Sequence, residues 1–329
     1  MADTSGIVAL AGGVGGAKLA HGLQAHLGGR LTVVVNTADD LERHGLLVMP
    51  DHDTVMYTLA GIANREWGWG IEGETFAAAD MLARYGEPIW FRLGDRDLAT
   101  HIVRTVRLRE GGRLADVCLA LQRWLGVAAR ILPMSDDPVR TEVLTDEGWL
   151  DFQEYFVGRH QEPEVRDVRF RGADIAGAAP GVVEAIETAA AIVVAPSNPI
   201  VSLGPILALS EIPDTLAAAR QRGVRIVAVS GIVAGRALKG PADRMLASLG
   251  HESSAAGVAK LLAGVATDFV LDTVDAGLAT EVERLGLRAH VRDTIMSDDA
   301  ARARVAGECL AIAGVGNAAS PAPATTPGP

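Results

Sequence analysis

Short apolar runs alternate with segments of helical spacing along most of the chain. Buried strands are predicted at residues 6–10 and 31–35, and helical spacing follows the first of them at residues 17–27. Further apolar runs that end in polar clusters predict strands at residues 88–91, 191–195, 224–229 and 269–271. Because helical segments separate these runs, we expect parallel strands joined by crossovers. The pattern predicts an α/β fold with a Rossmann-like, doubly wound and mostly parallel sheet.

One stretch of the chain departs from this rhythm. Residues 130–171 carry denser charge and alternating apolar and polar positions, which predict an inserted smaller α/β subdomain that is partly antiparallel. Residues 1–129 and 172–316 are then expected to form the Rossmann-like core with the active site. Residues 317–329 are rich in Ala, Pro and Thr, so a disordered tail is predicted there.

The tetrapeptide Met-Ser-Asp-Asp occurs twice, at residues 134–137 and 296–299. The second copy directly precedes a segment of helical spacing at residues 300–311. Ser297 or a neighbouring Asp is therefore expected to be the N-cap of that helix.

Composition fits this fold and excludes several classes of protein. There are 37 glycines but only 5 Trp, 3 Tyr and 6 Phe, which is typical of tight turns around an aliphatic core. The formal net charge of −11 disfavours general attraction to nucleic acid or to an anionic membrane, so neither partner is expected. Cys118 and Cys309 are isolated, which argues against a disulfide framework or a zinc site. Without a signal-peptide pattern or an apolar run of roughly 18 residues, a cytoplasmic protein is expected.

Gly12, Gly13, Gly15 and Gly16 lie between the first predicted strand and helix. Backbone N–H groups of such a loop can approach a phosphate closely, and the helix N-terminus adds about half a positive charge. The spacing is not the dinucleotide fingerprint, because Lys18 occupies the position that needs a third Gly or Ala. It is not a P-loop either, because no Ser or Thr follows Lys18. A tight turn without a ligand is the alternative.

Four carboxylates follow in two predicted loops. Asp39 and Asp40 come after the second predicted strand, and Asp51 and Asp53 come shortly afterwards. Because the carboxyl ends of strands line the ligand crevice of an open α/β sheet, the first pair is expected near the glycine loop. Oxygen ligands beside a phosphate suit Mg²⁺, which commonly takes one or two carboxylates together with substrate oxygens and water. Helix capping is the alternative for Asp51 and Asp53.

Residues 93–101 follow a predicted strand and concentrate hydrogen-bonding groups, so a second ligand loop is predicted there. Asp95 or Asp97 could instead pair with Arg96 or cap the next helix. Residues 133–137 open the inserted region, and residues 195–199 form a polar turn beyond a buried strand.

Two further pairs of side chains could contact a ligand. Lys239 and Arg244 could neutralise a phosphate, although solvated surface charges are the alternative. Trp67 and Trp69 could stack on a planar ring or stabilise a turn, and the sequence leaves both possibilities open.

Taken together, these motifs resemble one family. The motifs are Gly-Gly-Val-Gly-Gly-Ala-Lys-Leu, Val-Asn-Thr-Ala-Asp-Asp, His-Gly-Leu, Pro-Asp-x-Asp-Thr-Val, Leu-Gly-Asp-Arg-Asp-Leu-Ala-Thr-His, Ala-Pro-Ser-Asn-Pro and Lys-Gly-Pro-Ala-Asp. Their order from about residue 6 to residue 311 is similar to that of the 2-phospho-L-lactate transferase and phosphoenolpyruvate transferase family of deazaflavin coenzyme F-420 biosynthesis. His52 and Gly231 are departures, because an apolar residue and a proline are expected at these positions.

The resemblance implies a Mg²⁺-dependent phosphotransfer. A phospholactyl or phosphoenolpyruvyl group would move from a guanosine diphosphate-linked donor to the primary ribityl hydroxyl of 7,8-didemethyl-8-hydroxy-5-deazariboflavin, with release of GMP. Such a reaction depends mainly on alignment and charge neutralisation, so no covalent nucleophile is needed. The resemblance also implies a homodimer.

This reaction gives the candidate residues their expected roles. Asp39, with Asp51 or Asp53, would bind Mg²⁺, and Asp40 would accept the proton of the ribityl hydroxyl. The residues expected around the donor are Gly12, Gly13, Gly15, Gly16, Lys18, Ser197, Asn198, Lys239 and Asp243. The residues expected to border the deazaflavin are Asp95, Arg96, His101, Met134, Ser135 and Asp136.

Two other classes of protein fit part of the pattern. A nucleotide-sugar-binding regulatory protein of the same superfamily would bind its ligand without turnover, but the paired aspartates and residues 95–101 favour the transferase. An NAD-dependent oxidoreductase is disfavoured by the missing third fingerprint position and by the lack of an obvious acid/base pair for hydride transfer.

Overall fold

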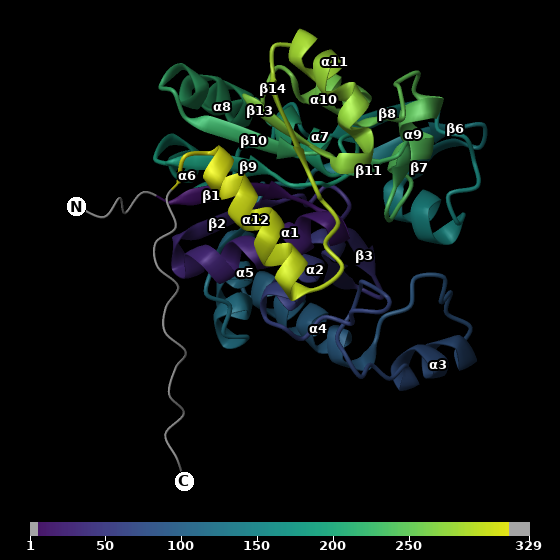
Figure 1. Ribbon diagram of the computed structural model, residues 1–329. Coiled ribbons are helices and arrows are strands. Elements are labelled where there is room, and N and C mark those ends of the chain that lie inside the picture. Colours follow the sequence, from purple (N-terminus) through teal and green to yellow (C-terminus); the bar gives the residue numbers. More distant parts are fainter. Residues whose placement is uncertain (1–5, 316–329) are drawn as a thin grey trace.

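The computed structural model describes residues 6–315, which are built around a seven-stranded sheet (Figure 1). The strands are β1 (Ile7–Ala11), β2 (Leu31–Val35), β5 (Arg130–Pro133), β9 (Ala191–Val194), β10 (Arg225–Val229), β13 (Asp268–Asp272) and β14 (Arg288–Arg292). All neighbouring strands are parallel, in the order β14-β13-β10-β9-β1-β2-β5. When the seven strands are renumbered by their order in the sequence and read from the β5 edge, the order is 3-2-1-4-5-6-7. This is the doubly wound Rossmann order with one added strand. The predicted fold class is confirmed.

The central strands are apolar throughout because helices cover both faces of the sheet. In β1, Ile7 and Ala9 face one apolar cluster, whereas Val8 and Leu10 face the other. Helices on the first face are α1 (Gly13–Leu27), α2 (Pro50–Leu59), α5 (Leu114–Trp124) and α12 (Asp299–Ile312). Helices on the second face are α6 (Val182–Glu187), α7 (Leu203–Ala208), α8 (Glu211–Gln221), α9 (Ala242–Ser248), α10 (Ala255–Leu262) and α11 (Ala279–Arg284). Within residues 6–315, no helix combines the length and apolar character needed to cross a bilayer.

The strands predicted at residues 6–10, 31–35, 191–195, 224–229 and 269–271 are all present to within two residues. The strand predicted at residues 88–91 is wrong, because these residues connect α3 (Ala77–Arg84) to α4 (Asp95–Arg109). Trp90 packs edge-on against Phe91 and beneath the guanidinium of Arg43, so its apolar surface is used in aromatic contacts rather than in a sheet. The capping prediction is confirmed, since the Asp298 side chain accepts a hydrogen bond from the Ala301 amide at 2.8 Å.

A separate three-stranded antiparallel sheet lies within the predicted insertion. Its strands are β6 (Arg140–Thr145), β7 (Gly148–Asp151) and β8 (Asp167–Arg171), with the short π-helical turn η2 (Glu154–Gly158) between the last two. Val143, Leu150 and Tyr155 belong to its own small apolar cluster. Residues 130–133, in contrast, form the edge strand β5 of the main sheet, so the separate sheet begins later than the predicted boundary. The tail predicted at residues 317–329 lies outside the described residues.

Shorter elements complete the fold. They are the antiparallel pairs β3 (Leu41–Arg43) with β4 (Leu46–Val48) and β11 (Ile232–Val233) with β12 (Arg236–Ala237), and the 3₁₀ turns η1 (Gly28–Arg30) and η3 (Thr273–Leu278). In Figure 1, α3 projects from the body of the molecule at the end of a long excursion between α2 and α4. The β11–β12 hairpin lies between β10 and α9 along the chain, and therefore follows the carboxyl end of β10.

One buried carboxylate joins strands at the amino end of the sheet. Asp268, at the start of β13, accepts hydrogen bonds from Arg225 of β10 and from Arg288 of β14, and His290 Nε2 lies 2.8 Å from its Oδ1. Burial by itself would raise the pKa of Asp268, but its hydrogen bonds to Arg288, Arg225 and His290 hold the pKa well below the ordinary value. The ionised carboxylate therefore stabilises the fold.

We expect Asp268→Asn to lower the free energy of unfolding by about 1–3 kcal/mol, because the buried carboxylate loses its charge-assisted hydrogen bonds from Arg225 and Arg288, which are themselves partly exposed. Since the folded pKa is depressed, this stabilisation is fully present above the ordinary pKa of about 3.9 and is lost as the pH falls further. Urea denaturation of both proteins at pH 7 and below pH 4 measures the difference. The exposed Asp146→Asn serves as control and should change stability by less than about 0.5 kcal/mol. Equal stability of Asp268→Asn and wild type at pH 7 would contradict the assignment.

Candidate active site at the carboxyl end of the sheet

The strand order reverses between β1 and β9, and open α/β sheets bind ligands beyond the carboxyl ends of the strands at such a point. Here the loops that follow β1 and β9 are hydrogen-bonded to each other. The Gly12 amide donates to Ser197 Oγ at 3.0 Å, and Ser197 Oγ donates to the Gly12 carbonyl at 2.8 Å. Ser197, predicted beside the donor, thus uses its hydroxyl to hold the loop after β9 against the loop after β1.

The predicted glycine loop is the first turn of a helix, because α1 already begins at Gly13. A Cβ on Gly12 would lie 2.5 Å from Asp51 Oδ2, one on Gly15 would lie 2.3 Å from the Pro196 carbonyl oxygen, and one on Gly16 would lie 2.7 Å from Ser197 Oγ. These glycines therefore let the N-terminus of α1 pack directly against Asp51 and the loop after β9. The same close packing brings the partial positive charge of the helix N-terminus to the crevice.

Three carboxylates gather beside this helix terminus. Asp39 and Asp40 follow β2 and are each only 5% exposed. Asp51 lies in the first turn of α2, so the segment predicted as a loop is helical. Asn36, directly after β2, donates through Nδ2 to Asp51 Oδ2 at 3.0 Å and accepts the Ala38 amide at 2.9 Å. Asn36 thereby fixes the carboxylate of Asp51 relative to the chain that carries Asp39.

The aspartates are costly to ionise in this position. Burial raises the pKa of Asp39 well above its ordinary value, and the neighbouring Asp51 raises it further. Burial also raises the pKa of Asp51 to about 6, although the Asn36 side chain and the Gly13 amide oppose this rise. The pKa of Asp40 is raised well above its ordinary value by burial, which Arg140 and Arg104 offset only in part.

Several oxygens of this cluster are buried without a hydrogen-bond partner among the described residues. They are Asp39 Oδ1, Asp40 Oδ1, Thr37 Oγ1 and Thr141 Oγ1. Buried polar atoms are normally paired, so this concentration needs an explanation. A hard divalent cation accepts oxygen ligands of this kind and would relieve the repulsion between Asp39 and Asp51. The donor set therefore fits Mg²⁺.

Asp53, predicted as a possible metal ligand, is committed to an ion pair. Arg104 of α4 donates to both of its carboxylate oxygens, through Nη1 at 3.0 Å and through Nη2. Burial by itself would raise the pKa of Asp53, but Arg104, with His52 and His101, holds it well below its ordinary value. Because the guanidinium already neutralises this carboxylate, we do not assign Asp53 to the metal.

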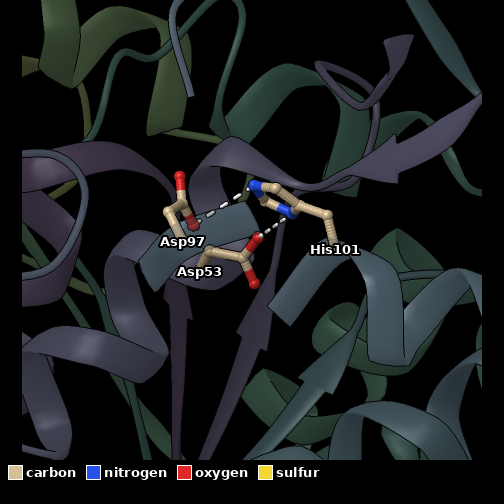
Figure 2. A group of neighbouring side chains, drawn as sticks. All are labelled: Asp53, Asp97 and His101. Atoms are coloured by element: carbon tan, nitrogen blue, oxygen red, sulfur yellow. Dashed lines mark ion pairs between the residues drawn. The ribbon is translucent and has the colours of Figure 1, made fainter. Parts of the chain in front are cut away.

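Asp97 and His101 belong to the same buried network (Figure 2). His101 lies between the two carboxylates, with Nε2 3.2 Å from Asp97 Oδ1 and Nδ1 3.6 Å from Asp53 Oδ2. Tyr57 of α2 donates to Asp97 Oδ1 at 2.7 Å. The ligand atoms are close enough for a metal, but Arg104 already supplies the positive charge. The network joins α2 to α4, and His101 is only 1% exposed.

The loop predicted at residues 93–101 is wrong as a conformation, because Asp95 begins α4. Asp95 accepts the amides of Ala77 and Ala78 at 2.9 and 3.0 Å and so caps α3. In return, Glu74 accepts the amides of Arg96 and Asp97, both at 2.9 Å, and caps α4. Asp95 was expected, as an alternative, to cap the next helix, but it caps the preceding helix α3, and each of the two helices is capped by a residue that precedes or begins the other.

Residues 134–136, predicted to border the deazaflavin, form a junction within the protein. Met134 is fully buried in the core, and Ser135 Oγ donates to the Gly177 carbonyl at 2.6 Å. Asp136 accepts the Ala115 amide at 2.8 Å in the first turn of α5. Their polar groups thus hold the end of β5 in place.

The remaining predicted residues lie in the segments that follow β9 and β12. Asn198 Oδ1 accepts the Ile200 amide at 2.9 Å and shapes the loop after β9. Asp243 lies in the first turn of α9. Lys239 is exposed beyond β12, and its Nζ donates to the Trp67 carbonyl at 3.2 Å. The ring centroids of Trp67 and Trp69 lie 5.3 Å apart, and the two residues are 41% and 44% exposed.

Three residues of the cluster were not predicted as site residues. Asn36 directly follows a predicted strand, and this position could have identified it. Thr141 and Arg104 come from the antiparallel sheet and from α4, and nothing in their local sequence indicates that they approach the aspartates.

Opposite stability effects are expected from the same substitution at two neighbouring aspartates. In metal-free protein at pH 8, Asp39→Asn should raise the free energy of unfolding by at least about 1 kcal/mol, because a raised pKa means that the ionised group opposes folding. Asp53→Asn should lower it by about 3–5 kcal/mol, because it leaves Arg104 buried without its partner. Denaturant unfolding with chelator measures both. The gain of Asp39→Asn should vanish as the pH falls towards 4, where Asp39 is protonated in the unfolded as well as in the folded wild-type protein; destabilisation at pH 8 would contradict this account.

Comparison with known proteins identifies the family. The family model described as 2-phospho-L-lactate transferase CofD matches residues 7–303. A phosphoenolpyruvate transferase of Streptomyces griseus is 46% identical over 315 residues, which cover 93% of this chain and 98% of that protein. A 2-phospho-L-lactate transferase of Methanosarcina mazei is 40% identical over 292 residues, which cover 88% of this chain and 95% of that protein.

Among solved structures, a UPF0052 family protein of Bacillus halodurans superposes with a TM-score of 0.62 over 93% of this chain and 99% of that chain. Its sequence identity is 15%, so this likeness shows the fold alone. The sequence relatives carry the family assignment, and the resemblance based on the motifs is confirmed. The chain therefore belongs to the 2-phospho-L-lactate transferase CofD family.

Proposed function

We propose that this transferase moves a phospholactyl or phosphoenolpyruvyl group from a guanosine diphosphate-linked donor to the ribityl hydroxyl of 7,8-didemethyl-8-hydroxy-5-deazariboflavin, releasing GMP, in coenzyme F-420 biosynthesis. The observation that carries the proposal is the buried pair Asp39 and Asp51 beside the N-terminus of α1. Carboxylates for a divalent cation and a helix terminus for an anion together suit a diphosphate. The names of the relatives supply the transferred groups.

Asp39 and Asp51 would hold Mg²⁺, which when bound neutralises charge on the donor diphosphate. Asn36 orients Asp51 for this role through its 3.0 Å hydrogen bond. The ribityl oxygen forms a bond to the phosphorus that carries the three-carbon acid, and the bond from that phosphorus to the GMP oxygen breaks. GMP leaves with the electron pair. Alignment and charge neutralisation account for most of such a catalytic effect.

Asp40 would accept the proton of the ribityl hydroxyl. Its pKa lies well above the ordinary value because of burial, so its ionised form is a stronger base than an exposed carboxylate. Its Oδ1 is buried and makes no hydrogen bond to the described residues, so this atom is free to accept a proton.

Trp67 and Trp69 would provide the surface for the deazaflavin ring. The two indoles are close, partly exposed and packed on Phe76, with centroid separations of 5.8 and 6.4 Å. The intervening Gly68 approaches Val14 in the first turn of α1, since a Cβ on Gly68 would lie 3.3 Å from a Val14 methyl. A planar ring on these indoles would therefore lie beside the proposed phosphate site.

Transfer is tested by mixing the protein with Mg²⁺, the deazaflavin and each guanosine-linked donor, and following GMP and the coupled product by mass spectrometry. We expect GMP release with at least one donor and loss of it with chelator. Asp39→Asn should reduce turnover by roughly 100-fold or more, because the metal and diphosphate lose their alignment. The exposed Asp174→Asn is the matched control and should retain wild-type turnover. No GMP release with either donor would refute the proposed function.

The acceptor surface is tested separately with Trp67→Leu and Trp69→Leu. Each variant should raise KM for the deazaflavin by roughly 5- to 100-fold while changing KM for the donor little, because ring stacking contributes about 1–3 kcal/mol. Trp149→Leu is the control, since this indole is 37% exposed on β7 of the separate sheet. Unchanged KM for the deazaflavin in both variants would place the ring elsewhere.

A further inference from the structure

Lysine is rare in this chain and unevenly placed. The sequence contains only three lysines, at positions 18, 239 and 260, among 30 basic residues. Lys18 and Lys239 line one cleft, although 221 positions separate them in the sequence. Lys260 lies exposed on α10, on the other face of the sheet. Two of the three lysines thus lie in one cleft of a protein whose net charge is −11.

The cleft has a volume of about 170 Å³ and lies where α1, α2 and α12 meet the residues after α2. Its charged lining consists of Lys18, Arg65, Lys239, Arg302 and a single acidic residue, Glu66. Asp299 pairs with both Arg65 and Arg302, each at 3.0 Å, so one carboxylate is shared by two guanidinium groups. The cleft therefore keeps an excess of positive charge.

Arg302 provides an independent sign of a ligand. Its side chain is only 9% exposed, and its buried Nε makes no hydrogen bond to any described residue. Burial lowers the pKa of Lys18, and the nearby Arg302 and Lys239 lower it further. Three cations thus repel one another around a space that an anion of a few atoms would fill.

The cleft adjoins the proposed phosphate site. Val14, in the first turn of α1, and Thr54, near the start of α2, belong to its lining. Thr54 follows Asp51 by three positions, which is about one helical turn. A donor with its diphosphate beside Asp51 could place its next anionic group in the cleft.

We propose that this cleft binds the carboxylate of the three-carbon acid and selects donors that carry it. The inference rests on the proposed function. With Mg²⁺ and the α1 terminus facing the diphosphate, the acid carboxylate is the remaining anion of the donor. Lys18, Lys239 and the guanidinium of Arg302 bind it through charge-assisted hydrogen bonds.

Two donors test the selection: the carboxylated guanosine-linked donor and guanosine 5′-(ethyl diphosphate), which keeps the diphosphate but lacks the carboxylate. Arg302→Gln and Lys239→Met should each raise KM for the carboxylated donor by roughly 10- to 100-fold and change the result for the ethyl donor by less than about 3-fold. Arg236→Gln, exposed on the same hairpin as Lys239, is the matched control and should leave both donors unchanged. Equal losses with both donors would overturn the proposal, because the cleft would then bind a phosphate.

Reductive methylation with formaldehyde gives a readout that needs no turnover. Without acceptor, the carboxylated donor should protect Lys18 and Lys239 by at least about 5-fold relative to GDP, while Lys260 should react equally in all samples. Equal protection by GDP, or no protection by the donor, would overturn the carboxylate assignment. If the wild type protects its lysines but never releases GMP with the deazaflavin present, the proposed transfer fails while the binding assignment stands.

Discussion

Negative charge buried without a partner is the constraint on which this site depends. Asp39, Asp40 and Asp51 meet at the carboxyl end of the sheet, where burial raises the pKa of each. Elsewhere the same fold balances its buried carboxylates, with Arg104 on Asp53 and with Arg225 and Arg288 on Asp268. The contrast separates two uses of aspartate within one molecule. Carboxylates that pair with arginine hold elements together, whereas the three buried aspartates without such a partner favour the binding of a cation.

Close packing explains how the fold brings that group of aspartates to the N-terminus of α1, where the partial positive charge of the helix lies. Gly12 approaches Asp51, and Gly15 and Gly16 approach the loop after β9, so α1 starts almost against the strands. Larger residues would move the helix terminus away from Asp51. In the proposed function the glycines would contribute to phosphate binding indirectly, through the position of the helix rather than through a flexible loop.

The sequence predicted the features that repeat or lie close together along the chain. Continuous apolar runs identified most strands, and the position directly after β1 and β2 identified the crevice with Asp39 and Asp40. Long-range contacts were beyond prediction: Arg104 neutralises Asp53 from a helix 51 positions away, and Ser197 meets Gly12 across 185 positions. The prediction for residues 88–101 was wrong because the aromatic run at residues 88–91 resembles a strand. In the structure this run lies in the connection before α4, which begins at Asp95.

The reciprocal capping of α3 and α4 has a consequence for how this part of the chain unfolds. Glu74 lies before α3 but holds the first turn of α4, and Asp95 begins α4 but holds the first turn of α3. Neither helix can fray at its N-terminus without releasing a carboxylate that the other needs. Residues 74–97 should therefore open and close as one cooperative unit, with amides in both first turns exchanging their hydrogens at similar rates.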